Sequence, residues 1–122
     1  MSNHPIVHIE FSSLNREASA AFYQNLFGWQ VRQIPEMDYA TFDSGEGSVG
    51  GGFNPVHEQN PAGTVTVYVN TDDIRATLAQ VVALGGKAIS DPMPIPGVGL
   101  FAYFQDPTGN TLALLEPHMD QQ

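Results

Sequence analysis

The chain has 122 residues, the size of one ordinary domain, and its 13 Asp and Glu against 4 Lys and Arg give a net charge of -9. A nucleic-acid-binding protein needs a basic surface to displace counterions from phosphates, so this charge excludes nucleic acid as an expected partner. The sequence has no apolar run of about 18 residues, no basic and apolar N-terminal segment and no cysteine. We therefore expect no membrane-spanning helix, no secretory signal and no disulfide, and a cytoplasmic protein.

The first half of the chain predicts one strand, one helix and three further strands. Alternating residues rich in β-formers predict the first strand over Ile6 to Phe11. Asn15 suits the N-cap of a helix that runs through Phe27, and Gly28 stands where a left-handed C-terminal cap is needed. The remaining strands of this half are expected at residues 29–34, near 39–42 and at 48–53.

The second half repeats this pattern after a polar segment, residues 55–63, that reads as a linker. It predicts a strand over Thr64 to Thr71 and a helix capped by Asp72 or Asp73 and ended by Gly85 and Gly86. Further strands are expected near residues 87–90 and at 100–105 and 111–115. A loop with three prolines precedes the strand at 100–105, and a tight turn at 106–110 precedes the last strand.

Equal cap-to-glycine spacing in the two helices supports an internal repeat. Asn15 is as far from Gly28 as Asp73 is from Gly86, and this alignment places His8 opposite Thr66 and Glu10 opposite Tyr68. We expect a single α+β domain over residues 1–122, made of two βαβββ modules at about 5–54 and about 64–117. The alternative is a chance likeness between two unrelated strand–helix pieces.

Motifs distributed along the chain, taken together in order and spacing, resemble the vicinal oxygen chelate superfamily. These motifs are Val7-His8-Ile9-Glu10-Phe11, Ala21-Phe22-Tyr23, Leu26-Phe27-Gly28-Trp29, Leu84-Gly85-Gly86 and Phe104-Gln105-Asp106-Pro107-Thr108-Gly109-Asn110. That superfamily includes glyoxalase I, bleomycin-resistance proteins, fosfomycin-resistance enzymes and extradiol dioxygenases. The resemblance implies paired βαβββ modules whose mixed sheet curls around a cavity, commonly in a homodimer.

The resemblance also implies where a catalytic metal would be held. Catalytic members bind a divalent ion through His, Glu or Gln side chains from four strands, and the four positions fall on His8, near Gly50 or Gly51, on Thr66 and on Ala113. Only His8 offers a good ligand, so we expect the metal site to be lost and no cofactor to be present. A relocated site remains an alternative, because His8 and Glu10 project from one face of their strand and a partner subunit could add a third group.

The expected cavity wall supplies the candidate ligand-binding residues. They are His8, Glu10, Thr66, Tyr68, Tyr39 and Tyr103. The last two depend on strand register, because a shift of one residue would turn them to the other face. His8 and Glu10 could act as an acid–base pair; equally, the histidine could be a hydrogen-bonded part of a half-buried sheet, and Tyr68 could serve packing alone. The run Gly50-Gly51-Gly52 predicts a bent strand or a close approach of ligand or backbone.

These observations favour a metal-free small-molecule-binding protein of the glyoxalase/bleomycin-resistance type. Its partner would be a small organic ligand, and the negative charge of the chain suits a cationic one. The alternative is a lyase or dioxygenase-like enzyme with a non-standard site around His8 and Glu10, so catalysis stays open. A third possibility is a protein whose pocket is filled by side chains and whose role is interaction.

Overall fold

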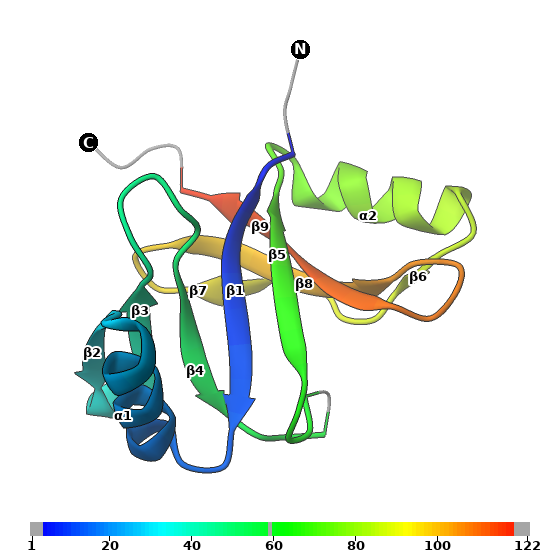
Figure 1. Ribbon diagram of the computed structural model, residues 1–122. Coiled ribbons are helices and arrows are strands. Elements are labelled where there is room, and N and C mark those ends of the chain that lie inside the picture. The colour runs from blue at the N-terminus through cyan, green and yellow to red at the C-terminus, as the bar shows by residue number, and fades with distance from the viewer. Residues whose placement is uncertain (1–3, 59, 119–122) are drawn as a thin grey trace. The chain divides into compact units, whose positions relative to one another are not determined.

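A computed structural model describes residues 4–58 and 60–118 of the chain (Figure 1). The chain divides into two compact units, which we describe separately. The N-terminal unit comprises Val7–Val67, and the C-terminal unit comprises the described residues from Tyr68 onward together with residues 4–6. Among the described residues, no helix has both the length and the apolar character needed to cross a membrane.

The N-terminal unit contains a four-stranded mixed sheet with one covering helix. Its elements are β1 (Ile6–Ser13), α1 (Arg16–Phe27), β2 (Gln30–Ile34), the 3-10 helix η1 (Pro35–Met37), β3 (Tyr39–Asp43) and β4 (Gly51–Pro55). The strand order is β2-β3-β4-β1. β3 runs antiparallel to β2 and β4, whereas β4 is parallel to β1. The last strand of the module therefore returns beside the first.

The C-terminal unit repeats this arrangement with one added strand. Its elements are β5 (Val65–Asn70), α2 (Ile74–Ala83), β6 (Lys87–Ala88), β7 (Met93–Ile95), β8 (Gly99–Gln105) and β9 (Thr111–Pro117). The boundary between the two units falls within β5, whose residues 65–67 count with the N-terminal unit. The strand order is β5-β9-β8-β6, and β7 also pairs with β8. β5 and β9 are parallel, as β1 and β4 are in the other unit. The α+β class and the βαβββ pattern of both halves are confirmed.

Both helices begin where the sequence places their caps. The Asn15 side chain accepts a hydrogen bond from the Ala18 amide, and Gly28 ends α1 in the left-handed conformation with φ 75°. At α2 the cap is Asp73, whose carboxylate accepts from the Ala76 amide. These are short-range interactions, so the local sequence is enough to predict them.

The proline-rich loop was predicted wrongly in one respect, because it contains strand β7. Pro94 pairs with Leu100 of β8, and in the described chain β7 has no other strand beside it. Proline is tolerated at a sheet edge because its missing N–H costs no ladder hydrogen bond there. β4 is also shifted from its predicted range, since it begins at Gly51 and includes Pro55, which was assigned to the linker. The short helix η1 was not predicted.

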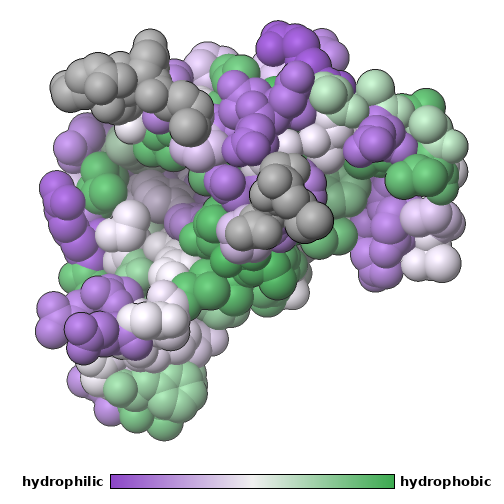
Figure 2. All heavy atoms as spheres, turned by 90° about the horizontal axis from the view of Figure 1, so that it is seen from above, coloured by the Kyte–Doolittle hydropathy of each residue, from purple (hydrophilic) through white to green (hydrophobic). Residues whose placement is uncertain are grey.

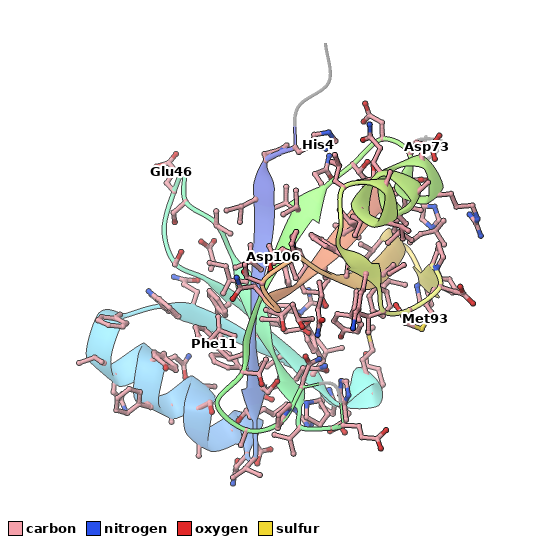
Figure 3. All side chains as sticks on the ribbon, turned by 90° about the vertical axis from the view of Figure 1, so that its right-hand side faces the viewer. His4, Phe11, Glu46, Asp73, Met93 and Asp106 are labelled. Carbon is pink, nitrogen blue, oxygen red and sulfur yellow. The ribbon has the colours of Figure 1, made fainter. Side chains whose placement is uncertain are left out.

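An aromatic core fills the space between α1 and its sheet. Phe11 projects from β1 toward α1 (Figure 3), where its ring stacks on Tyr23 at 5.6 Å. Tyr23 stacks on Trp29 at 5.2 Å, and Trp29 stacks on Phe42 at 4.6 Å. Side chains alternate along a strand, so the residues next to Phe11 and Phe42 point to the opposite face of the sheet. The core thereby fixes which residues of β1 and β3 are presented on that face.

Apolar side chains also reach the surface, in addition to this core. Figure 2 shows hydrophobic and hydrophilic residues interspersed on the face seen from above. Phe22, Leu26 and Phe27 of α1 are each more than half exposed. Single exposed apolar residues are normal, but several on one helix indicate a surface able to contact another molecule.

Candidate functional site

The candidate site lies on the sheet face of the N-terminal unit opposite α1. β1 places His8 and Glu10 on this face, because they are two residues apart and flank the core-facing Ile9. Glu10 is aligned with Gly52 of β4, and Gly52 with Thr41 of β3. Tyr39 is two residues from Thr41 and so shares its face. The three adjacent strands therefore bring His8, Glu10 and Tyr39 together.

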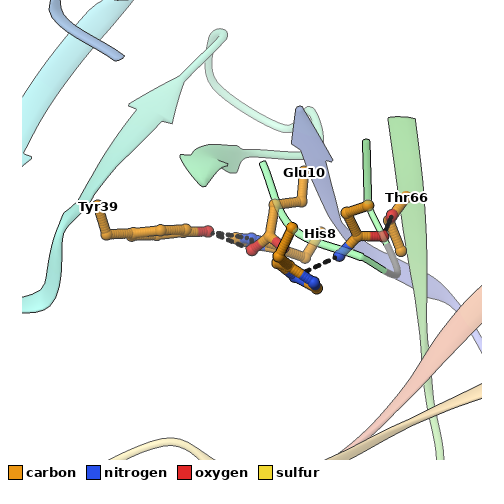
Figure 4. Close-up of polar contacts among 6 residues, drawn as sticks. His8, Glu10, Tyr39 and Thr66 are labelled. Atoms are coloured by element: carbon orange, nitrogen blue, oxygen red, sulfur yellow. Dashed lines mark hydrogen bonds and ion pairs between the residues drawn. The ribbon is translucent and has the colours of Figure 1, made fainter. Parts of the chain in front are cut away.

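The Tyr39 hydroxyl approaches the other two side chains from one side and contacts both (Figure 4). It donates to Glu10 Oε2 at 2.8 Å and lies 2.8 Å from His8 Nε2. Because the hydroxyl proton is directed at the carboxylate, the imidazole Nε2–H is the donor to the tyrosine oxygen. His8 Nε2 and Glu10 Oε2 are 3.7 Å apart. We call these three residues the polar trio; it forms one hydrogen-bonded chain from imidazole through phenol to carboxylate.

The trio is largely withdrawn from solvent. Glu10 is 8% exposed, and the His8 side chain keeps 28% of its surface accessible. A buried carboxylate is stable only when it is hydrogen-bonded or paired with a positive charge. The Tyr39 hydroxyl supplies such a hydrogen bond, and the imidazole keeps part of its surface accessible to a ligand.

Gly52 makes room for the Tyr39 ring. A Cβ atom at position 52 would lie 1.9 Å from the tyrosine oxygen and 2.2 Å from Cζ, far inside van der Waals contact. At the neighbouring Gly51, a Cβ atom would lie 1.7 Å from the carbonyl oxygen of Ile9. The prediction of a close approach at the glycine run is confirmed, with a different neighbour at each of these two positions.

Thr66 belongs to the same unit and enters a second set of polar contacts. Its hydroxyl donates to Asn60 Oδ1 at 3.4 Å, and Asn60 Nδ2 lies 3.1 Å from His57 Nε2. Thr66 and Asn60 are each 2% exposed. Figure 4 shows Thr66 on the far side of His8 and Glu10 from Tyr39. No local pattern predicts that Asn60, inside the expected linker, is buried beside the site.

Tyr68 and Tyr103 lie in the C-terminal unit, where they pack with Ala113. Tyr68 is 5% and Tyr103 6% exposed, and Ala113 is fully buried. Ala113 is aligned with Tyr68 on one side and with Tyr103 on the other. The structure therefore unites two of the six candidate residues here and places the other four in the N-terminal unit.

The residues at the four inferred metal positions do not fit a divalent ion. Among the described residues, no group of three or more His, Cys, Asp and Glu could hold one. His8 Nε2 carries the proton that it donates to Tyr39, so its lone pair is not available there. Thr66 donates to Asn60. Gly50, Gly51 and Ala113 have no ligating side chain.

A surface groove of about 370 Å³ is present elsewhere in the N-terminal unit. It lies at the start of α1 and is bounded by Ser13–Glu17, Asp38 and Pro55. None of the six candidate residues lines it. Arg16 in this groove pairs with Asp38 and donates to Gln33. The charged side chain in the groove is therefore already paired within the N-terminal unit, and no residue of the polar trio lines the groove.

Sequence comparison finds some relatives of about the same length as this chain and others more than twice as long. A glyoxylase-like domain-containing protein of Didymella fabae is 34% identical over 113 residues, covering 87% of this chain and 88% of that protein. The putative glyoxylase CFP32 of Mycobacterium bovis is 32% identical over 108 residues, covering 86% of this chain but 41% of the relative. Anthracycline biosynthesis protein DnrV of Streptomyces peucetius is 33% identical over 113 residues, with 80% and 41% covered. The chain thus spans less than half of the last two.

Solved structures agree with the fold. The hypothetical protein BH1468 of Bacillus halodurans superimposes with a TM-score of 0.73 at 14% identity, covering 99% of both chains. Streptomyces coelicolor methylmalonyl-CoA epimerase gives 0.68 at 17% identity, again covering 99% of each chain. The model of the Glyoxalase/Bleomycin resistance protein/Dioxygenase superfamily matches residues 6–114. This chain belongs to the glyoxalase/bleomycin resistance protein/dioxygenase superfamily.

Proposed function

We propose that this protein binds a small organic ligand without a metal ion, in the manner of a bleomycin-resistance protein. One observation carries the proposal: the Tyr39 hydroxyl lies 2.8 Å from both His8 Nε2 and Glu10 Oε2, where a metal-dependent member would need free ligand atoms. The trio combines a partly exposed imidazole with a hydrogen-bonded carboxylate. Sites for small molecules usually contain a small number of polar groups that fix the orientation of the ligand, and the trio could supply them.

Charge favours a cationic ligand. With Glu10 ionised and His8 neutral, the trio carries one negative charge, and the chain as a whole carries -9. A positively charged ligand would gain from both the local carboxylate and the long-range field. We therefore propose a ligand with a protonated amine.

We also propose that Tyr68 and Tyr103 contribute to ligand binding and that the protein is cytoplasmic. We further propose that it forms a homodimer. The exposed Phe22, Leu26 and Phe27 of α1 support an association surface. Analytical ultracentrifugation should give twice the 13.2 kDa chain mass. A monomer at micromolar concentration would rule this assembly out.

A matched pair of probes tests the binding proposal. Tyramine and tyrosol share a phenol and an ethyl spacer but end in an ammonium and a hydroxyl group, respectively. Tyramine should raise the unfolding temperature in the presence of EDTA, and tyrosol should have a smaller effect. At 100 times the dissociation constant, a ligand stabilises the folded state by about 2.7 kcal/mol.

Two substitutions connect this effect to the site. Glu10→Gln keeps the shape of the side chain and removes its charge, so it should weaken tyramine binding more than tyrosol binding. His8→Ala should weaken binding of both, and the same comparison on Tyr68→Ala tests the tyrosine. Equal stabilisation by the two probes, or unchanged affinity in Glu10→Gln, would contradict an ammonium ligand at the trio. One tightly held ion per native chain would contradict the metal-free assignment.

A metal-independent enzyme is the second candidate, because the same hydrogen-bonded chain could move a proton. An imidazole linked through a phenol to a carboxylate is suited to general acid–base catalysis. Exchange of carbon-bound hydrogen for deuterium in dihydroxyacetone, followed by NMR in the presence of EDTA, measures this activity. Catalysed exchange that Glu10→Gln abolishes would favour the enzyme over the binding protein.

A further inference from the structure

We propose that Tyr39 and Gly52 together exclude a divalent ion from His8 and Glu10, the tyrosine hydroxyl standing in for the ion as the bridge between them. This inference rests on the proposed metal-free function. It names Tyr39 and Gly52 as the two residues that keep the metal ion out. Tyr39 is thus a specificity-determining residue of the site. Its role is to hold the imidazole and the carboxylate in a metal-free state.

The first step of the argument is the geometry of the bridge. His8 Nε2 and Glu10 Oε2 are 3.7 Å apart, a gap that two ligand bonds of about 2.0–2.2 Å can span. The two atoms are therefore close enough to bind one ion. The Tyr39 oxygen instead hydrogen-bonds to both, and in doing so keeps the proton on Nε2. A metal ligand must be a deprotonated imidazole nitrogen, so the bridge and the ion compete for the same atoms.

The second step concerns the missing third ligand. In the N-terminal unit, Gly52 of β4 is aligned with Glu10 of β1. In the C-terminal unit, Ala113 of β9 is aligned with Tyr68 of β5, the residue equivalent to Glu10 in the repeat. Gly52 is thus the β4 counterpart of Ala113, one of the inferred metal positions, so strand pairing moves the β4 position from Gly50 or Gly51, where the sequence placed it, to Gly52. Any side chain at position 52 would start 1.9 Å from the Tyr39 oxygen. A ligand from β4 and the tyrosine bridge cannot occupy this place together.

The C-terminal unit has a comparable arrangement around Ala113. Fully buried Ala113 packs with Tyr68 and Tyr103, so there too a small residue occupies the strand position beside a tyrosine. Each module has a residue without ligating atoms where the superfamily pattern expects a ligand. A small residue packed against an aromatic ring is thus a feature of both halves of the chain.

The test removes the tyrosine bridge and restores a β4 ligand in the 122-residue chain. In the double variant Tyr39→Ala/Gly52→Glu, His8, Glu10 and the new carboxylate are all available to an ion. Co²⁺ is the probe, because its visible absorption reports coordination directly, and titration calorimetry gives the stoichiometry. We expect one Co²⁺ per chain, bound roughly 100-fold more tightly than by the unchanged protein. Adding His8→Ala should remove the gain.

Two simpler variants keep the test decisive if the double variant does not fold. Tyr39→Ala removes only the bridge and should raise Co²⁺ affinity roughly 10-fold, because groups hydrogen-bonded to ligand atoms alter metal affinity on this order. Tyr39→Phe removes the hydroxyl but keeps the ring, which still fills part of the space beside His8 and Glu10, so a smaller gain is expected. Circular dichroism verifies the fold of each variant.

The outcomes separate this inference from the proposed function. If the folded variants bind Co²⁺ no better than the unchanged chain, exclusion by Tyr39 is wrong, while tyramine binding by the unchanged chain would still support the proposed function. If the unchanged chain itself binds one Co²⁺ through His8, both proposals fail. If Co²⁺ affinity rises as expected but tyramine never binds, exclusion stands and the ligand assignment falls.

Discussion

Gly51 and Gly52 of β4 each leave room for a neighbouring atom that a Cβ atom would clash with, but the neighbour differs. At Gly51 an added Cβ atom would lie 1.7 Å from the backbone oxygen of Ile9, whereas at Gly52 it would meet the end of the Tyr39 side chain. A backbone carbonyl in a parallel strand pair cannot move without breaking the pairing of β1 and β4. A tyrosine hydroxyl can swing aside at the cost of its two hydrogen bonds.

Substitution at these two positions should therefore separate stability from site geometry. Gly51→Ala should lower the free energy of unfolding by at least the roughly 1–3 kcal/mol typical of overpacking. Gly52→Ala should cost less stability but displace the Tyr39 hydroxyl and weaken tyramine binding. Urea denaturation measures the first effect and calorimetry the second. Equal losses of stability in the two variants would show that the difference in neighbours has no consequence.

At the scale of the elements, the turn between β8 and β9 is held by one carboxylate. Asp106 accepts hydrogen bonds from the Asn110 side chain and backbone and from the Thr108 backbone and hydroxyl. These bonds, those from Asn110 first, lower the pKa of Asp106 from 3.8 to about 2. A lowered pKa means that this stabilisation is present above the ordinary value and is lost as the pH falls toward 2.

Removing the main partner should raise that pKa. In Asn110→Ala the Asp106 pKa should move upward, toward 3.8, because the carboxylate loses the bond from the Asn110 side chain. Carbon-detected NMR titration of the carboxyl group measures it in both proteins. An unchanged pKa in the variant would mean that the remaining bonds, from the backbone amide of residue 110 and from Thr108, set the value.

On the scale of the whole molecule, the charge of -9 acts on any ligand that approaches. Tyramine affinity should fall as salt rises, because the Debye length shrinks from about 10 Å at 0.1 M to about 3 Å at 1 M. Part of the affinity should persist, since the largely buried Glu10 is screened less than a surface charge. Tyrosol binding, measured by the same calorimetry, should be nearly independent of salt. A common salt dependence for both probes would show that charge does not guide binding.

The sequence by itself determined the parts of this protein that depend on near neighbours. Asn15 and Asp73 cap their helices through amides three residues away, and Gly28 adopts the left-handed angle that its position requires. The alternation in β1 and β5 and the equal helix spacings were enough to predict both modules. Propensity and periodicity act within a few residues, so they can be read without a structure.

The sequence was enough to name His8, Glu10 and Tyr39 as candidates, but only the tertiary structure decided which candidate residues meet. Tyr39 meets His8 and Glu10 because β3, β4 and β1 pair in one particular register, and one residue of shift would turn its ring away. The use of Gly52 as space for that ring, the burial of Asn60 in an expected linker and the acceptance of Pro94 in edge strand β7 likewise depend on residues distant in sequence. Which atoms face one another is set by strand pairing and packing, and neither is contained in any local stretch of the chain.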